Sequence, residues 1–157
     1  EKLNLSPTDS RKLNDSLLLF YTGITRQATS ILAEQHANMN SNLQILQAMT
    51  KLAHEGKEAI LQGALDDFGE VLHRSWELKK MLASKITDHR IDELYRVARK
   101  AGAIGGKITG AGGGGFLLLY CPTGKQDDVR KALKLRELRF RFEQDGSKTI
   151  FNYRRSS

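Results

Sequence analysis

A run of glycines between residues 110 and 115 constrains this 157-residue chain more than any other feature of its sequence. Residues 107–120 read Lys-Ile-Thr-Gly-Ala-Gly-Gly-Gly-Gly-Phe-Leu-Leu-Leu-Tyr, so five glycines fill six consecutive positions between two β-prone segments. A packed core has no need of such a run, because each glycine adds conformational entropy that folding must overcome. The run does supply a backbone that can adopt positive φ and lie close to another molecule. Its consecutive N–H groups can converge on an anion, most commonly a phosphate.

The glycines match G-x-G-x-x-G as Gly110, Gly112 and Gly115, so several nucleotide-binding motifs compete with a ligand-free alternative. A dinucleotide-binding fold needs these glycines to open a helix, whereas here they precede 116–120, a strand by composition. A Walker loop ends in Gly-Lys-Ser/Thr before a helix, which this run does not. A protein-kinase glycine loop requires later His-Arg-Asp and Asp-Phe-Gly segments, and neither follows Gly115. The ligand-free alternative is a flexible hairpin tip.

The net charge of +7, from 25 Lys and Arg against 18 Asp and Glu, suggests a basic nucleic-acid binder as one functional hypothesis. Much of the excess lies near the C-terminus. Between Glu137 and Phe142 apolar residues alternate with charged ones, a pattern typical of a strand with one face on the core and the other in water. A solvated strand face accounts for these arginines without a partner. Because no known binding motif accompanies them, we predict no nucleic-acid partner.

Other kinds of site are also disfavoured by the composition. The single cysteine, Cys121, excludes an internal disulfide and ends an apolar strand, so we expect a small buried hydrophobe and a reducing cytoplasm. The four histidines form no metal-ligand spacing with it or with each other, and we predict no metal site in this chain. No apolar run is long enough to span a bilayer, so we expect no membrane partner.

Apolar spacing and turn residues predict helices gathered in the middle of the chain and strands towards its ends. This order indicates an α+β fold with helices packed on an antiparallel sheet. In the first part of the chain we expect a strand end at 3–5, a turn at 6–9 and a strand at 17–22. The helical middle comprises a region from Thr25 with a break at 38–42 and an interruption at Gly56, a helix at 57–83, and a helix capped by Thr87 or Asp88 and stopped by Gly102. The last part comprises the two strands around the glycine run, a helix at 126–134, and strands at 137–142 and 147–151 joined by Asp145-Gly146.

The segment Lys107-Ile-Thr-Gly-Ala-Gly-Gly-Gly-Gly-Phe116 resembles the third signature motif of the GHMP kinases, small-molecule kinases that include galactokinase, homoserine kinase and mevalonate kinase. Within that superfamily the chain is most similar to the D-glycero-D-manno-heptose 7-phosphate kinases. Three further segments support the resemblance in the same order, at 20–26, 68–80 and 98–107. The Trp76-Glu-Leu-Lys-Lys80 segment narrows it to heptose-type or fucose-type sugar kinases.

The resemblance implies a ferredoxin-like GHMP kinase C-terminal domain over residues 1–157. It implies phosphoryl transfer from ATP, with magnesium, to the anomeric hydroxyl of a heptose 7-phosphate. In such kinases an N-terminal domain supplies a Gly-Leu-Gly-Ser-Ser-type phosphate loop and acidic residues, and this sequence contains no such loop. We therefore expect a fragment of a longer enzyme, inactive alone, whose partner is its own N-terminal domain. A non-catalytic sugar-phosphate-binding or regulatory module of the same fold is the alternative.

The resemblance also assigns roles to individual residues. The loop Gly110, Ala111, Gly112, Gly113, Gly114 and Gly115 would frame the phosphates of ATP, and no residue of this chain would be catalytic. Substrate-binding roles fall to Lys107, Thr109, Arg26 and Lys80. Lys79 and Lys80 point about 100° apart around a helix, so at most one faces the substrate, and the choice between them stays open. Trp76 continues an apolar stripe, and we expect it in the core.

Overall fold

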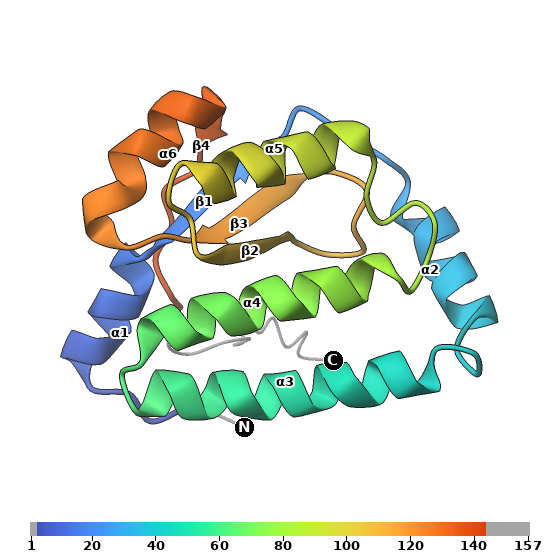
Figure 1. The fold of residues 1–157 in the computed structure, drawn as a ribbon, viewed down its shortest axis with the longest axis horizontal. Helices are drawn as coiled ribbons and strands as arrows, with labels where there is room; N and C mark the ends of the chain where they lie inside the picture. Colours follow the sequence, from blue (N-terminus) through green and yellow to red (C-terminus); the bar gives the residue numbers. More distant parts are fainter. Residues whose placement is uncertain (1–2, 144–157) are drawn as a thin grey trace, which may run out of the picture.

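A four-stranded antiparallel sheet organises the chain in the computed structural model, which describes residues 3–143 (Figure 1). The strand order is β2-β3-β1-β4. The strands are β1 (Leu17–Tyr21), β2 (Gly105–Ile108), β3 (Phe116–Tyr120) and β4 (Arg136–Glu137), and the helices are α1 (Pro7–Asp15), α2 (Ala28–Ala37), α3 (Leu43–Leu61), α4 (Leu65–Lys80), α5 (His89–Lys100) and α6 (Gln126–Leu133), with a 3-10 turn at Thr123–Lys125. Helices packed on an antiparallel sheet confirm the predicted α+β class.

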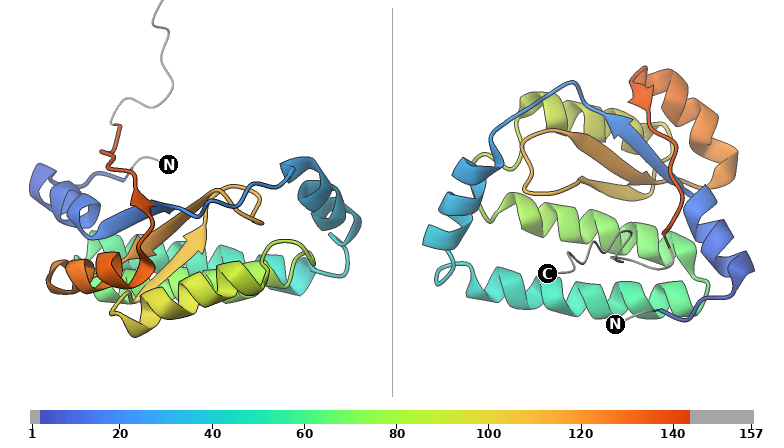
Figure 2. Two further views of the ribbon diagram at one scale, coloured as in Figure 1. Left: turned by 90° about the horizontal axis from the view of Figure 1, so that it is seen from above. Right: turned by 180° about the vertical axis from the view of Figure 1, so that it is seen from behind.

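One face of the sheet forms the core. In the register of β1 and β3, Leu18 lies opposite Leu119 and Phe20 opposite Leu117, and all four side chains are buried. Because side chains alternate along a strand, these four point to the same side. They share one apolar cluster with residues of α5 and α6, the helices that cover this side. Figure 2 shows α5 running along the sheet and α6 at its end.

Helix α4 packs along the β2 edge of the sheet, where it also contacts α5, and α3 packs on α4 (Figure 1). Two glycines permit this approach. A Cβ on Gly105 would stand 1.9 Å from the carbonyl oxygen of Gly69, and a Cβ on Gly69 would stand 2.4 Å from the Tyr120 ring. No side chain fits between the helix and the strand at these positions. On the face opposite α5 and α6, no helix of residues 3–143 lies across β1, and Tyr21 there keeps 37% of its surface exposed.

Several element boundaries follow the sequence signals. The Asp88 carboxylate accepts a hydrogen bond from the Ile91 amide at 3.0 Å, so Asp88 rather than Thr87 caps α5. Gly102 follows the end of α5 with φ of +117°, as expected for a C-terminal stop. Trp76 is 1% exposed and belongs to the core, and Cys121 is fully buried, which raises the pKa of its thiol to about 11. Both residues confirm their predicted structural roles.

The helix predicted over 57–83 is wrong, because it spans two helices. Gly63, with φ of +70°, ends α3 just beyond Leu61, and α4 begins at Leu65. Gly56 does not interrupt α3 either. It lies buried within that helix, where a Cβ would meet Val71 of α4 at 3.3 Å.

Both chain ends also depart from expectation. Residues 3–5 form no strand, and the predicted turn at 6–9 opens α1, where the Ser6 hydroxyl accepts from the Asp9 amide at 3.1 Å. The strand predicted at 137–142 is reduced to β4. Leu138 and Phe142 are 46% and 40% exposed, so the alternation does not bury its apolar side. The strand at 147–151 and its turn at 145–146 lie outside the described residues.

Candidate functional site

The glycine run forms the loop of a β-hairpin between β2 and β3. Gly110, Gly112, Gly113, Gly114 and Gly115 all have positive φ, from +71° to +146°. L-amino acids rarely adopt this backbone region, so the loop conformation itself requires glycine. Sterics add a second requirement at Gly114, where a Cβ would stand 2.4 Å from the carbonyl oxygen of Ile24. The run therefore folds into a specific shape rather than a loose tip.

The loop is fastened to two neighbouring segments through its backbone. The Gly113 amide donates to the Ile86 carbonyl and the Gly115 amide to the Ile24 carbonyl, each at 2.7 Å. The Gly115 carbonyl in turn accepts from the amide and the hydroxyl of Thr22, both at 2.9 Å. These contacts tie the loop to the segment after β1 and to the segment before α5. They fix the position of the loop without any ligand.

The loop amides therefore divide into two groups. Those of Gly113 and Gly115 are engaged with protein carbonyls. Those of Gly110, Ala111, Gly112 and Gly114 donate to no protein acceptor within the described residues. Gly110 is exposed at the tip of the hairpin. Because free backbone N–H groups favour an anion, the tip is the part of the loop that can receive one.

Two lysines stand beside the tip. Lys79, in the last turn of α4, donates from Nζ to the Gly110 carbonyl at 2.6 Å. Burial, together with the nearby charge of Lys107 on β2, lowers the pKa of Lys79 to about 8. Within residues 3–143 no carboxylate lies within 4.0 Å of either ammonium group. The pair is a local concentration of positive charge without a protein counterion.

A substrate-binding role was predicted for Lys80, the residue that follows Lys79 on α4. Lys80 forms an ion pair with Glu77 at 2.8 Å and lies 3.9 Å from Asp92 on α5, so its charge is compensated. Both lysines follow Trp76 by about one turn, and periodicity cannot distinguish them. The angle at which α4 crosses β2 decides which one reaches the loop. That angle is a tertiary property with no signal in the local sequence.

The remaining predicted site residues also lie around the loop. The Thr109 hydroxyl donates to the Phe116 carbonyl at 3.3 Å across the base of the hairpin. Arg26 lies beside the loop, because a Cβ on Gly113 would be 3.3 Å from its Cδ. Its guanidinium pairs with Asp88, a residue that sequence reasoning identified only as a helix cap. The structure thus brings Arg26, Lys107 and Thr109 to one loop. Arg26 and Thr109 already have protein partners there, whereas Lys107 has no ion pair among residues 3–143.

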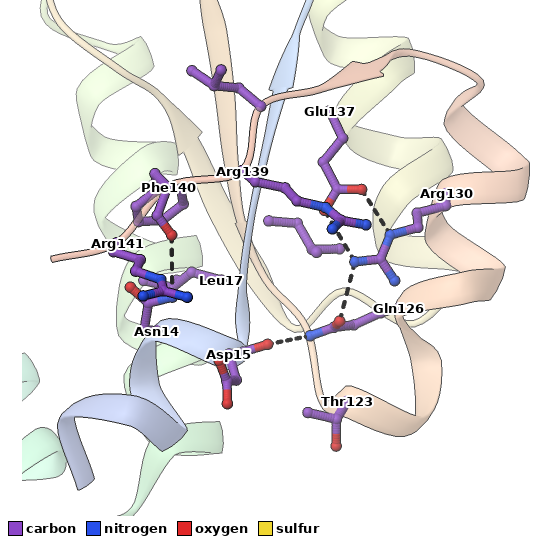
Figure 3. A pocket seen from close by; sticks show the side chains of 12 residues that line it. Asn14, Asp15, Leu17, Thr123, Gln126, Arg130, Glu137, Arg139, Phe140 and Arg141 are labelled. Atoms are coloured by element: carbon purple, nitrogen blue, oxygen red, sulfur yellow. Dashed lines mark hydrogen bonds and ion pairs between the residues drawn. The ribbon is translucent and has the colours of Figure 1, made fainter. Parts of the chain in front are cut away.

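A second polar region lies at the opposite end of the sheet, where β1 begins. A cavity of about 630 Å³ there is lined by side chains from α1, β1, α6 and the β4 segment, including Asn14 and Arg130 (Figure 3). Its two further arginines, Arg139 and Arg141, are exposed at the rim. The cavity is separated from the glycine loop by the length of β1, since the loop adjoins the last residue of that strand. It shares no residue with the predicted site.

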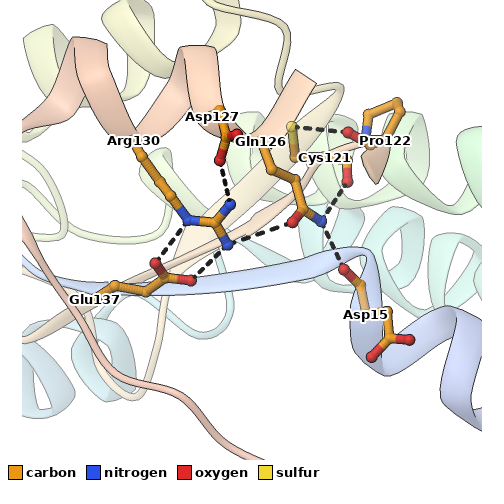
Figure 4. A network of polar contacts seen from close by, with 7 residues as sticks. All are labelled: Asp15, Cys121, Pro122, Gln126, Asp127, Arg130 and Glu137. Carbon is orange, nitrogen blue, oxygen red and sulfur yellow. Dashed lines mark hydrogen bonds and ion pairs between the residues drawn. The ribbon is translucent and has the colours of Figure 1, made fainter. Parts of the chain in front are cut away.

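The cation inside this second region is already neutralised. The Arg130 guanidinium donates to both carboxylate oxygens of Glu137, at 2.8 and 3.0 Å, and to Asp127 at 3.0 Å (Figure 4). The hydrogen bonds from Arg130 lower the pKa of Glu137. The Gln126 amide nitrogen donates to the Asp15 carbonyl at 2.6 Å. The network fastens α6 to β4 and to the start of β1, and we interpret it as architectural.

The described part of the chain contains no candidate for metal binding. No three His, Cys, Asp or Glu side chains among residues 3–143 come together as a metal site would require. Among the described residues beside the glycine loop, the carboxylate of Asp88 is paired with Arg26, and the cations and backbone amides there suit anions. No helix in the same residues is long and apolar enough to cross a membrane.

Comparison with known families agrees with this geometry. The sequence model of the family "GHMP kinases C terminal" matches residues 57–137, about half of the chain, including α4, α5, both hairpin strands and the glycine loop. The chain belongs to the GHMP kinases. The predicted family is thereby confirmed, and kinases of this family use ATP as phosphate donor, generally with magnesium.

The curated relatives include kinases for several acceptors. D-glycero-alpha-D-manno-heptose 7-phosphate kinase of Campylobacter jejuni is 28% identical over 125 residues, which cover 78% of this chain and 37% of that protein. L-fucokinase/L-fucose-1-P guanylyltransferase of Bacteroides fragilis is 34% identical over 79% of this chain and 13% of that protein. Mevalonate kinase of Pyrococcus horikoshii is 35% identical over 73% of this chain and 35% of that protein. The chain therefore spans little more than a third of these relatives at most.

Solved structures share the fold. A D-glycero-D-manno-heptose 1-phosphate kinase from Bacteroides thetaiotaomicron matches 97% of this GHMP kinase chain and 41% of its own, with a TM-score of 0.64 and 22% identity. Mevalonate kinase of L. major matches 75% of this chain and 37% of its own, with a TM-score of 0.65 and 22% identity. At this level of identity the two structures support the fold alone.

Proposed function

We propose that residues 1–157 act as the C-terminal domain of an ATP-dependent sugar kinase that phosphorylates the anomeric hydroxyl of D-glycero-D-manno-heptose 7-phosphate. The observation that carries the proposal is the pre-shaped glycine loop, whose free tip amides lie near two ammonium groups that have no counterion among residues 3–143. Membership of the GHMP kinases supplies the reaction class. The heptose kinase of Campylobacter jejuni supports the choice of acceptor, and the resemblance of Trp76-Glu-Leu-Lys-Lys80 to heptose-type and fucose-type kinases favours a sugar over mevalonate.

Phosphoryl transfer depends on positioning and on neutralising the charge of the phosphoryl oxygens, and this chain offers residues for both tasks. The tip amides of Gly110 and Ala111 provide N–H donors for the phosphoryl oxygens, and the Lys79 and Lys107 ammonium groups provide positive charge that can hold a phosphorylated acceptor in position. The anchored amides of Gly113 and Gly115 hold the loop in position, so no rearrangement of the loop is needed for binding. Pre-organised donors of this kind stabilise charge without reorganisation during the reaction.

The proposal assigns the rest of the chemistry to a preceding domain. Magnesium carries charge between the phosphates in such reactions, and the described residues hold no carboxylate cluster for it. A base for the acceptor hydroxyl and the main phosphate loop would come from that domain as well. In the enzyme, the glycine loop would face that phosphate loop across the active site.

Release of ADP by the full-length protein tests the proposal. Purified enzyme is supplied with Mg-ATP and, in separate reactions, heptose 7-phosphate, fucose, galactose or mevalonate, with a reaction lacking acceptor as the control. We expect acceptor-dependent ADP release to be fastest with heptose 7-phosphate, and phosphorus NMR to place the new phosphate on the anomeric carbon. Fastest turnover with another acceptor would refute the substrate assignment. Heptose 7-phosphate binding without ADP release from any acceptor would favour a non-catalytic sugar-phosphate module.

A further inference from the structure

The charged groups near the end of α4 differ in whether they have partners. Lys80 is paired with Glu77, Arg26 with Asp88, and the Arg74 guanidinium with a carboxylate of α3. Lys79 and Lys107, like Lys85 whose carbonyl adjoins Gly113, have no carboxylate within ion-pair distance among residues 3–143. Two neighbouring cations that lack a counterion repel each other. An anion between them would relieve that repulsion.

The donors at this position are only partly used. An ammonium group carries three N–H donors, and Lys79 uses one of them on the Gly110 carbonyl. The remaining two and the three of Lys107 leave five donors for a small anion. A phosphomonoester offers three terminal oxygens and a charge near −2 at neutral pH, which matches two lysines. A neutral sugar hydroxyl would leave both charges uncompensated.

The surroundings of the pair suit an attached carbon skeleton. Lys107 lies directly opposite Leu118 in the register of β2 and β3, so the two side chains share a sheet face. Phe116 lies two residues before Leu118 on that same face, and its ring is 5.5 Å from the ring of Tyr21 on β1. Leu118 and Phe116 are half-buried and Tyr21 is 37% exposed. Figure 2, right, shows this face of the sheet, which no helix of residues 3–143 crosses.

We propose that Lys79 and Lys107 bind the phosphate that the acceptor already carries, with its carbon skeleton lying on Leu118 and Phe116. The inference rests on the proposed kinase function and makes the lysine pair the residues that select phosphorylated over neutral acceptors. The phosphate of the acceptor, and not the phosphates of ATP, is assigned here because the pair adjoins the apolar sheet face. A nucleotide phosphate would instead lie along the loop amides.

Charge-removing substitutions in the full-length enzyme test the assignment. Lys79→Gln and Lys107→Gln are compared with Lys79→Arg, which keeps the charge, and with Lys131→Gln, an exposed lysine of α6. We expect each glutamine variant at the pair to raise KM for heptose 7-phosphate by about 10–100-fold, because it loses one hydrogen bond to a charged group. The KM for ATP should change little. Lys79→Arg should recover most of the loss, and Lys131→Gln should match the parent enzyme.

Each other outcome has a definite meaning. A raised KM for ATP with an unchanged KM for the acceptor overturns the inference and assigns the pair to the nucleotide, while the kinase function stands. Unchanged values for both substrates also overturn it, and would leave Lys79 as a clamp on the Gly110 carbonyl. If the parent enzyme releases no ADP with any acceptor, the proposed function fails. Calorimetry with ribose 5-phosphate then tests the anion site directly, and binding that survives both glutamine substitutions overturns it.

Discussion

The steric requirement for glycine differs between two adjacent positions of the loop, which yields a matched pair of substitutions. Gly114 has φ of +146°, and a Cβ there would stand 2.4 Å from the Ile24 carbonyl oxygen. Gly115 has φ of +84°, and a Cβ there meets nothing within 4 Å. Alanine at either position incurs backbone strain, but only Gly114→Ala forces a neighbouring backbone atom to move. The comparison therefore isolates the packing of the loop from its conformation.

The size of the effect follows from the contacts. Backbone strain from a non-glycine residue in this region costs about 1–3 kcal/mol at either site. At Gly114 the Ile24 carbonyl must retreat, and this carbonyl also accepts the Gly115 amide at 2.7 Å. A buried donor left unsatisfied adds about 1–3 kcal/mol. We expect Gly114→Ala to lower the free energy of unfolding by about 3–5 kcal/mol and Gly115→Ala by about 1–2 kcal/mol.

Urea unfolding followed by tryptophan fluorescence measures this difference. The chain contains one tryptophan, Trp76, and its side chain is 1% exposed in the fold, so its emission reports on core opening. A gap of about 2 kcal/mol between the variants corresponds to roughly 4–8 °C in Tm for a chain of this size. Equal losses of stability in the two variants would refute the reasoning, because they would mean that the loop is not packed against Ile24 as described.

Three further predictions concern charge and packing. Binding of a phosphorylated acceptor should weaken as pH rises through about 8, where Lys79, desolvated and beside Lys107, loses its proton; KM at pH 7 and pH 9 measures this. Gly69→Ala should lower stability by about 1–3 kcal/mol in urea despite its better helix propensity, because the new Cβ meets Tyr120. Glu137→Gln should cost about 1 kcal/mol at pH 7 in urea unfolding, and this cost should shrink as the pH falls through the lowered pKa of the Glu137 carboxylate, below which the wild-type pair is lost as well.

Local sequence signals predicted the structure correctly where a residue type at that position has a single structural role. Asp88 caps α5, Gly102 stops it, and the glycine loop joins two strands as the motif indicated. Gly56 and Gly63 show the limit of such signals. One is buried inside a helix against α4 and the other ends that helix with positive φ, yet the sequence around each is equally helical. Only the packing of α3 on α4 distinguishes the two uses.

The same limit applies to the candidate site. The sequence identified the loop, Lys107 and Arg26 as parts of the site. It could not select Lys79 over Lys80, because the two lysines are neighbours on one helix. It also read the alternation after Glu137 as a strand on the core, whereas Leu138 is exposed there. Which lysine meets the loop and which side of a strand is covered depend on how helices and strands cross. Neither has a local signature.

The division of the loop amides offers the most direct test of the account as a whole. Full-length protein labelled with ¹⁵N-glycine is titrated with heptose 7-phosphate and with a non-hydrolysable ATP analogue. We expect the Gly110 and Gly112 amides, which have no protein acceptor in the described structure, to shift, while Gly113 and Gly115 stay nearly unchanged and protected from hydrogen exchange. If none of these amides responds to either ligand while the enzyme turns over, the loop is not the phosphate-binding element that we describe.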